Sequence, residues 1–411
     1  MNEPSKKTGR YVLGGALVLC LFIILGWFAF REEPSPPDQQ PAKAETVKPV
    51  APTTEPTNEV SNEVPTNQLN DSATTNAADL YRQAFALYNA LTNDEKDILR
   101  DWQTNVDAAV ETALCEKIRP ICDLMHQASA VTNCDWGFEP LSVDTTMTVL
   151  KPLNSARNIA RTAIWSAAHC RSNDMSGAAD DTMSVLHLGQ QFSQTGMIGS
   201  LVDMALQGLA SSYVAANLGR FQGSDAQRLA AAFSDPTYEQ APSLAMAEEA
   251  DMQERFVEEL ETKQASEVEK QFSDSAQFFG GLPTNLNQAA ILVGFKQIAD
   301  SERELANILA FSSEDEYEAW QKEVTELQSS SPFAGFALEA DEAFVDKVRR
   351  YEVDRALVVA GFAIAQSGVN ALQSILDPSS GQPFVYTETA DGFRLQSTYQ
   401  VDGKPMTMQF K

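Results

Sequence analysis

The sequence predicts a mainly α-helical protein: an irregular array of helical hairpins with a small C-terminal antiparallel β-meander, tethered by one N-terminal transmembrane helix. Three observations support this fold class. An uncharged stretch lies near the N-terminus, apolar residues recur at helical spacing over residues 77–376, and residues 377–411 alternate with a period of two.

The N-terminal stretch Tyr11–Phe30 contains no charged residue. A helix of about 20 residues spans roughly 30 Å, which matches the hydrocarbon core of a bilayer. Because Lys6, Lys7 and Arg10 precede this stretch, the positive-inside rule predicts that residues 1–10 lie in the cytoplasm and that the bulk of the chain lies outside it. The membrane is therefore the first expected partner.

Two alternatives to a retained anchor are a cleaved signal peptide and a lipoprotein signal. A signal peptide has a shorter apolar region and small residues at its cleavage site, whereas this stretch is long and carries Trp27, which suits a membrane interface. Leu17–Cys20 has the outline of a lipoprotein signal, but a bulky leucine precedes the cysteine and apolar residues continue after it. We therefore expect an uncleaved single-pass anchor.

Residues 31–76 are rich in Pro, Thr, Glu, Asn and Ala and nearly lack large apolar side chains. Such a segment cannot bury a core, so we expect a disordered, partly polyproline stalk. A stalk of this length reaches between roughly 40 Å as a coil and about 140 Å when extended. The folded part is then held away from the membrane.

The body has helical periodicity from its first residues. Leu80, Ala84, Leu87 and Leu91 form one apolar stripe, and Thr92–Glu95 is a capping box that opens the next helix. Further helices are predicted over residues 106–114, 121–131, 144–171, 174–195, 197–219, 224–234, 239–278, 286–311, 314–328, 337–350 and 351–376.

Prolines and apolar runs refine these assignments. Pro120 is predicted to break or restart the helix in which it lies. The ten apolar residues Ala356–Ala365 are too few to span a bilayer, so they predict a buried central helix. After Asp377-Pro378, alternating side chains with turns at Asp391-Gly392 and Asp402-Gly403 predict a three-stranded meander that must pack on the helices.

No motif for catalysis, for a cofactor or for a metal rises above background in this sequence. His126, His169 and His187 each lie in an amphipathic helix without a matching ligand at helical spacing, which favours structural roles. The net charge of −27 argues against a nucleic-acid partner and is typical of a soluble surface. One predicted helix is dense in carboxylates, which we interpret as a solvated face: Glu248, Glu249, Asp251, Glu254, Glu258, Glu259 and Glu261.

The cysteines are the most specific local feature. Besides Cys20 in the membrane segment, the body contains Cys115, Cys122, Cys134 and Cys170, an even number suited to an oxidising compartment. Cys115 and Cys122 are about 10 Å apart along an unbroken helix, too far for a disulfide unless the chain folds at the intervening proline. The alternatives are Cys134 with Cys170, crossed pairs, or free buried thiols, and the sequence leaves them open.

Four segments together resemble a family of uncharacterised, membrane-anchored helical proteins of planctomycetes and related bacteria: Asn76–Phe85, Cys134–Gly137, Ser155–Ala160 and Ile198–Ala205. This resemblance covers most of residues 76–220. It implies an all-helical body in a bacterial envelope, with the anchor in the inner membrane, and it carries no assigned activity.

The tail resembles a second family. Asp377–Tyr386, followed by Asp391–Phe393, is similar to the C-terminal strands of type II secretion pseudopilins. Pseudopilins have a cleavage glycine before their apolar helix and a glutamate near its start. Here Gly14 and Gly15 lie within the apolar run and no glutamate is present, so the similarity is restricted to the tail.

These observations predict an interaction or scaffold module of the envelope with an unidentified protein partner. A motif-free helical array on a stalk fits this role, since such arrays offer concave binding surfaces. One alternative is a hydrolase of envelope polymers that uses carboxylates, which a cleft containing a carboxyl of raised pKa would favour. A second alternative, based on the tail, is an accessory component of a secretion apparatus.

Overall fold

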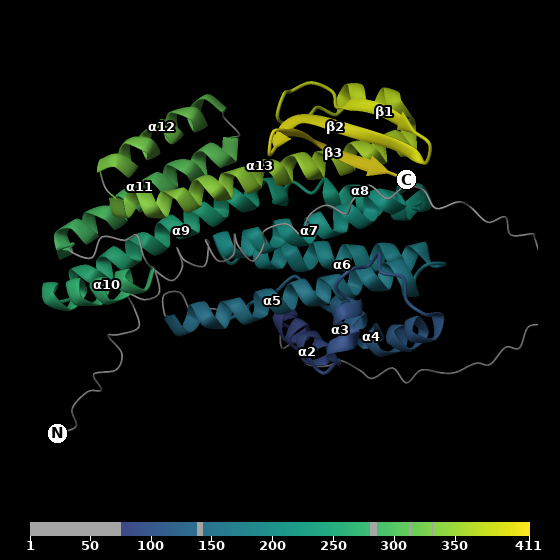
Figure 1. The fold of residues 1–411 in the computed structure, drawn as a ribbon, viewed down its shortest axis with the longest axis horizontal. Coiled ribbons are helices and arrows are strands. Elements are labelled where there is room, and N and C mark those ends of the chain that lie inside the picture. Colours follow the sequence, from purple (N-terminus) through teal and green to yellow (C-terminus); the bar gives the residue numbers. More distant parts are fainter. Residues whose placement is uncertain (1–74, 138–142, 280–285, 312–313, 331) are drawn as a thin grey trace, which may run out of the picture.

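A computed structural model describes residues 75–137, 143–279, 286–311, 314–330 and 332–411 (Figure 1). The described chain is mainly helical with a small three-stranded antiparallel sheet at its C-terminus, which confirms this part of the prediction. Residues 1–10, predicted to be cytoplasmic, the predicted anchor Tyr11–Phe30 and nearly all of the predicted stalk over 31–76 lie outside the described residues. Within the described ranges, no helix combines the length and the apolarity that a membrane span requires.

The first helices follow the predicted local signals. Asn76 precedes α2, and its side chain accepts a hydrogen bond from the Ala78 N–H. Thr92 and Glu95 form the predicted capping box at the start of α3. The bounds are Ala77–Asn89 for α2, Asn93–Ile98 for α3 and Ala108–Ser129 for α4.

The prediction that Pro120 breaks its helix is wrong, because α4 continues through it. A proline inside a helix costs about 3 kcal/mol, mainly because its ring crowds the preceding turn and the carbonyl four residues earlier loses its partner. That carbonyl belongs to Glu116, which is exposed, so water can solvate it. On the opposite face, Ile118, Ile121 and Met125 are buried in the core and hold the helix together.

The middle of the chain forms stacked helices close to the predicted ranges. α5 ends in a π-helical turn, η2, and the hydroxyl of Tyr213 donates a hydrogen bond of 2.8 Å to the carbonyl of Ala167 in this turn. The bounds are Val143–Trp165 for α5, Ser166–Cys170 for η2, Met175–Ser193 for α6, Met197–Asn217 for α7, Leu218–Arg220 for the 3₁₀ turn η3 and Gly223–Phe233 for α8.

Two predicted boundaries in the later helices need correction. The helix expected over 239–278 is divided at Thr262, whose hydroxyl donates to the Glu259 carbonyl and ends α9. Conversely, 337–350 and most of 351–376 belong to one helix, α13, which stops at Gly368, a residue with φ +80°. The bounds are Thr237–Glu261 for α9, Ala265–Phe279 for α10, Gln288–Phe311 for α11, Glu314–Ser330 for α12, Pro332–Ser367 for α13 and Val369–Ser374 for the 3₁₀ turn η4.

The C-terminal meander has the predicted strands and turns. β1 (Val385–Thr389), β2 (Gly392–Val401) and β3 (Lys404–Phe410) pair in sequence order. Asp402 and Gly403 both have positive φ, as a tight turn between twisted strands requires. The chain end is joined to the helices by backbone hydrogen bonds, from the Lys411 N–H to the Ala215 carbonyl and from the Gly219 N–H to the Lys411 carbonyl.

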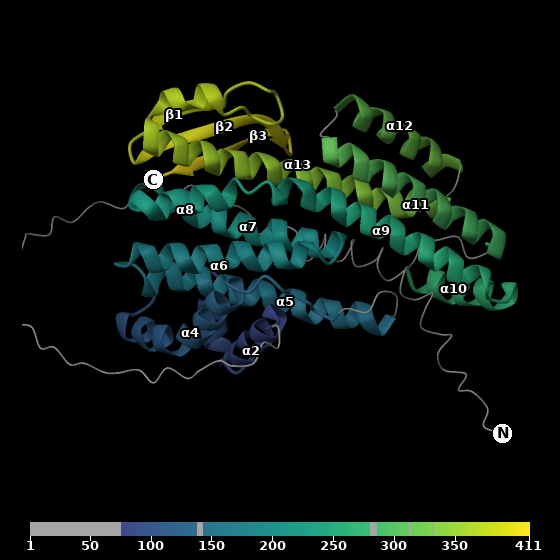
Figure 2. The same cartoon turned by 180° about the vertical axis from the view of Figure 1, so that it is seen from behind.

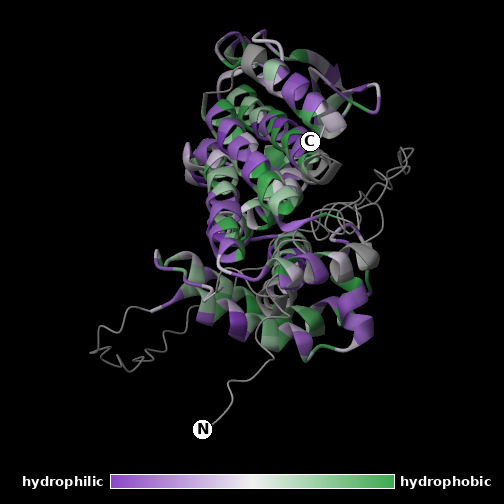
Figure 3. Cartoon of the chain, turned by 90° about the vertical axis from the view of Figure 1, so that its left-hand side faces the viewer, coloured by the Kyte–Doolittle hydropathy of each residue, from purple (hydrophilic) through white to green (hydrophobic). Residues whose placement is uncertain are grey.

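The buried apolar residues form two clusters. The first core combines α2–α8, the sheet and the C-terminal part of α13, including the buried run within Ala356–Ala365. The second core combines α9–α12 with the N-terminal part of α13. Figures 1 and 2 show these two ends of the molecule, with α13 extending through both. In Figure 3, hydrophilic and hydrophobic residues alternate along individual helices, as amphipathic packing requires.

Candidate functional site

The structure joins two of the four body cysteines. Cys115 on α4 and Cys170 at the end of η2 form a disulfide with their Cα atoms 5.5 Å apart. Cys122 and Cys134 are free thiols. Burial raises the pKa of the Cys122 thiol, and burial raises the pKa of Cys134 to about 12. Because neither thiol ionises near neutral pH, neither has the character of a nucleophile.

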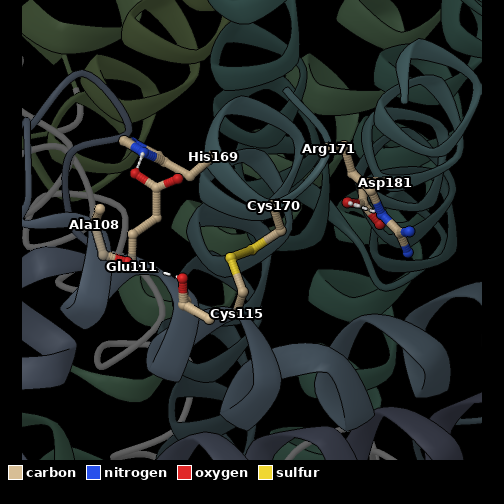
Figure 4. Close-up of a disulfide and its surroundings, with 8 residues drawn as sticks. Ala108, Glu111, Cys115, His169, Cys170, Arg171 and Asp181 are labelled. Atoms are coloured by element: carbon tan, nitrogen blue, oxygen red, sulfur yellow. Dashed lines mark hydrogen bonds and ion pairs between the residues drawn. A yellow bond between two sulfur atoms is a disulfide. The ribbon is translucent and has the colours of Figure 1, made fainter. Parts of the chain in front are cut away.

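The residues around the disulfide hold α4 against η2 (Figure 4). The Nδ1 atom of His169 lies 3.2 Å from Oε2 of Glu111, and its Nε2 atom lies 2.9 Å from the Trp102 carbonyl oxygen. On the other side of the bridge, Asp181 faces Arg171, with 3.7 Å between Nε and Oδ2. These polar contacts lie on both sides of the disulfide, an arrangement typical of a structural support.

Asp181 is fully buried and has two cationic neighbours. Its Oδ1 atom lies 2.8 Å from Nε2 of His126 on α4. The Asp181 carboxylate raises the pKa of His126 above its ordinary value, against the opposing effect of burial. For the third histidine, His187, burial lowers the pKa. These positions agree with structural roles for the histidines.

The interpretation of the α9 carboxylates as a solvated face is wrong for Glu249. This side chain is buried, and its Oε1 atom accepts a hydrogen bond of 3.2 Å from the Met197 N–H at the start of α7. The same region buries Glu302 from α11 and Asp341 from α13. Three carboxyl groups from three helices thus lie inside the second core, with Gln253 beside Glu302.

Burial dominates the ionisation of these three carboxyls. It raises the pKa of Glu249 to about 7. It also raises the pKa values of Glu302 and Asp341 well above the ordinary range, with mutual repulsion as the next cause. Among the described residues, no group of His, Cys, Asp or Glu has the arrangement of a metal site. Burial and mutual repulsion therefore favour the protonated forms of these carboxyls.

A cavity of about 220 Å³ lies where the second core meets the sheet. In Figures 1 and 2, α12 and the sheet lie on the same side of α13, and the cavity is lined from all three and from α11. Its apolar side chains come from α11, α13 and the segment before β1, and its polar side chains come from α12, α13, β2 and the same segment. The lining residues are Ile308, Leu309, Tyr317, Val345, Val348, Arg349, Glu352, Val353, Pro378, Ser379 and Tyr399.

The polar groups of the cavity are positioned by their own contacts. The guanidinium of Arg349 lies 4.0 Å from the ring centroid of Tyr317, a cation–π distance. The hydroxyl of Tyr399 donates to the carbonyl of Asp346 at 3.3 Å. Burial raises the pKa of Glu352 to about 7, and two arginines oppose this shift. A concave site with apolar side chains and a few fixed polar groups has the general form of a ligand pocket.

The sequence gives only weak signals of this site. Glu249 follows Met246 by three residues and precedes Gln253 and Phe256 on the same face, so its place in the apolar stripe of α9 is visible in retrospect. For the cavity, Tyr317, Glu352 and Tyr399 come from segments far apart in the chain, and no local pattern connects them.

Comparison of this chain with known protein families, with curated proteins and with solved structures finds no match.

Proposed function

We propose that this protein is a single-pass, membrane-anchored interaction module of the bacterial envelope, whose irregular array of helical hairpins lies outside the cytoplasm. The observation that carries this proposal is the cavity between α12, α13 and the sheet. Its apolar lining and the convergent groups of Arg349, Glu352 and Tyr399 are suited to recognising a ligand or a segment of a partner.

The proposed location depends on the sequence. Tyr11–Phe30 is the anchor, and the basic residues before it place the N-terminus in the cytoplasm. If residues 31–76 form the predicted stalk, the folded body can contact partners over a wide area on the outer side of the inner membrane. A partner in this setting is a protein or peptide of the envelope, and the acidic surface disfavours nucleic acid.

The hydrolase alternative has one supporting observation. Glu352 lies in the cavity and its pKa of about 7 suits a general acid. Hydrolysis of glycosidic bonds by the usual mechanism needs two carboxyl groups flanking the bond. The described lining of this cavity contributes a single carboxyl, so the geometry favours binding.

The alternative of an accessory role in secretion depends on the tail. The resembling strands pack on α7 and α13, and Phe384, Leu395 and Phe410 are buried in the first core. A tail used in this way stabilises the body and forms one wall of the cavity through Tyr399. This arrangement adds no support for pilus-like assembly.

Site-specific photocrosslinking in membranes tests the proposal. A photoreactive residue at Ser379, in the cavity lining, should give a reproducible adduct with one partner. The same residue at Glu116, an exposed position on α4 outside the lining, is the matched control. Adducts of equal pattern at both positions, or none at Ser379, would contradict a binding role for the cavity.

Protease added to spheroplasts tests the location. If the segment 31–76 is disordered as its composition predicts and the body lies outside the cytoplasm, cleavage within this segment should release the folded body. Complete protection of the body, with cleavage only after lysis, would place it in the cytoplasm.

A further inference from the structure

The charged groups of the cavity form a complementary pair on one helix. Arg349 and Glu352 are three residues apart on α13, so their side chains are neighbours on the helix surface. Both line the same small volume, next to the aliphatic side chains of Val345 and Val348. The cavity therefore places a positive group, a carboxyl and an apolar surface within reach of one small ligand.

The hydroxyl groups of the lining retain hydrogen-bonding capacity. Tyr399 donates its hydroxyl proton to the Asp346 carbonyl, so its oxygen can still accept a hydrogen bond. The Tyr317 hydroxyl accepts from Nε2 of Gln321 at 3.1 Å and can still donate. The Arg349 guanidinium has five N–H donors, so it can bind an acceptor in addition to its contacts within the protein.

We propose that this cavity binds a primary ammonium group that carries a short aliphatic chain and an adjacent carbonyl or carboxylate oxygen. Free aliphatic amino acids and the N-terminal residue of a peptide share this chemistry. The ammonium pairs with Glu352, the oxygen binds Arg349, and the aliphatic chain packs on Val345, Val348 and Ile308. The inference rests on the proposed function, because it names the ligand of the same cavity.

The charged neighbours of Glu352 set the pH dependence of this binding. Arg349 and Arg355 on α13 favour the ionised carboxylate, whereas Glu239 on α9 disfavours it, and Tyr399 from β2 faces the same group. Because burial raises the pKa of Glu352 to about 7, part of the population is protonated near neutral pH. Binding of an ammonium favours the ionised form, so it releases protons, and affinity falls as pH decreases below about 7.

Calorimetric titration of the full-length protein in detergent tests the ligand class. The probes are L-leucine, L-leucinamide, N-acetyl-L-leucine and the peptide Leu-Ala-Ala. L-Leucinamide should bind, and N-acetyl-L-leucine should bind at least about tenfold more weakly than L-leucine, because acetylation removes the ammonium charge. Tighter binding of Leu-Ala-Ala than of L-leucine identifies a peptide N-terminus as the natural source, and the reverse identifies a free amino acid.

Two further measurements assign the site. Glu352→Gln should weaken binding of L-leucine at least about tenfold, whereas Glu326→Gln, an exposed position on α12, should leave it unchanged. In the unaltered protein, protons released on binding are taken up by the buffer. The measured binding enthalpy should therefore change with the ionisation enthalpy of the buffer used. Equal affinity for N-acetyl-L-leucine, or no binding of any probe, overturns this inference. If no probe binds but the photocrosslink at Ser379 still forms, the proposed interaction function is retained and only the proposed ligand class is rejected.

Discussion

In the first core, the fully buried carboxylate of Asp181 lies 2.8 Å from His126 and faces Arg171, whereas the second core buries Glu249, Glu302 and Asp341 together. None of these three carboxyls has a salt bridge among the described residues. The nearest cation acting on Glu302 is Arg303, which pairs at the surface with other acids of α9. In the described structure, Oε2 of Glu302, Oδ2 of Asp341 and both carboxylate oxygens of Asp181 have no hydrogen-bond partner, so the two regions differ in their ion pairs.

This comparison shows two ways of burying a carboxyl group. Asp181 lies within ion-pair distance of His126 and Arg171, and the Cys115–Cys170 disulfide is close by. A carboxyl without a cation avoids the cost of a buried charge by binding a proton. Folding of the second core should therefore be coupled to proton binding. The first core adds ion pairs and a covalent bond, and it contains one comparable carboxyl, Asp203 on α7, whose pKa burial raises to about 7.

The largest expected effect is a loss of stability as pH rises. The folded-state pKa of Glu249, about 7, is raised above its ordinary value near 4.5, so the folded protein binds more protons in this range. The contribution of Glu249 to the free energy of unfolding is complete below pH 4.5 and is lost as pH rises toward 7. Over this interval the free energy of unfolding falls by up to about 1.4 kcal/mol per pH unit. Glu302 and Asp341 add to this slope in the same direction.

Urea unfolding at pH 5, 6 and 7 measures this loss of stability, and variants with a neutral side chain identify the carboxyl groups that cause it. Glu249→Gln and Glu302→Gln should flatten the dependence, since glutamine does not ionise. His126 also has a raised pKa, but its contribution is lost only above about pH 6.5, so the interval between pH 5 and 6 isolates the carboxyls. An unchanged slope in both variants would show that other groups control the pH dependence.

The next effect concerns the disulfide of the first core. Cys115→Ser should lower the free energy of unfolding by roughly 2–5 kcal/mol, because the bridge closes a long loop between residues 55 apart. The matched control is Cys134→Ser, which removes a half-buried free thiol and should change stability by about 0.5 kcal/mol or less. Intact mass after alkylation without reductant should show one bridge, and an alkylated Cys115 would contradict the pairing.

A smaller effect is expected where the sheet packs on α13. A methyl group at Gly361 would collide with the ring of Phe410, which is fully buried. Gly361→Ala should therefore destabilise by about 1–3 kcal/mol. Gly208→Ala, on α7 with open space around the added atom, should instead stabilise by about 0.5–1 kcal/mol. Thermal unfolding of the two variants measures the difference, and equal shifts would refute the close packing of the sheet.

The smallest effect is at the capping box of α3. Thr92→Ala removes the side-chain acceptor for the Glu95 N–H, which lies 3.3 Å away, and should destabilise by about 1 kcal/mol. Thr112→Ala is a suitable comparison, since Thr112 is exposed within α4 and bonds only to the preceding turn. If both substitutions have the same small effect, the cap contributes little to the first core.

The sequence by itself determined the local features of this protein. The helix α2, the capping box at Thr92 and the turns at Asp391-Gly392 and Asp402-Gly403 all lie where the pattern predicts them, although α2 buries Tyr81, Phe85 and Tyr88 and leaves Leu87 of the predicted stripe exposed. These features depend on residues within one or two turns of each other, so their energies can be judged without the rest of the fold. The anchor at Tyr11–Phe30 remains a prediction of the same local kind.

Only the tertiary structure decided the features that join distant segments. It selected Cys170 as the partner of Cys115, and it placed the Glu249 carboxyl inside a core although the carboxylates Glu248 and Asp251 beside it in the sequence are exposed. It also kept α4 intact through Pro120 and brought Tyr399 beside Glu352 to form the cavity. Each outcome depends on packing between elements far apart in the chain, where burial outweighs local preference, and a single sequence does not encode that balance in any local pattern.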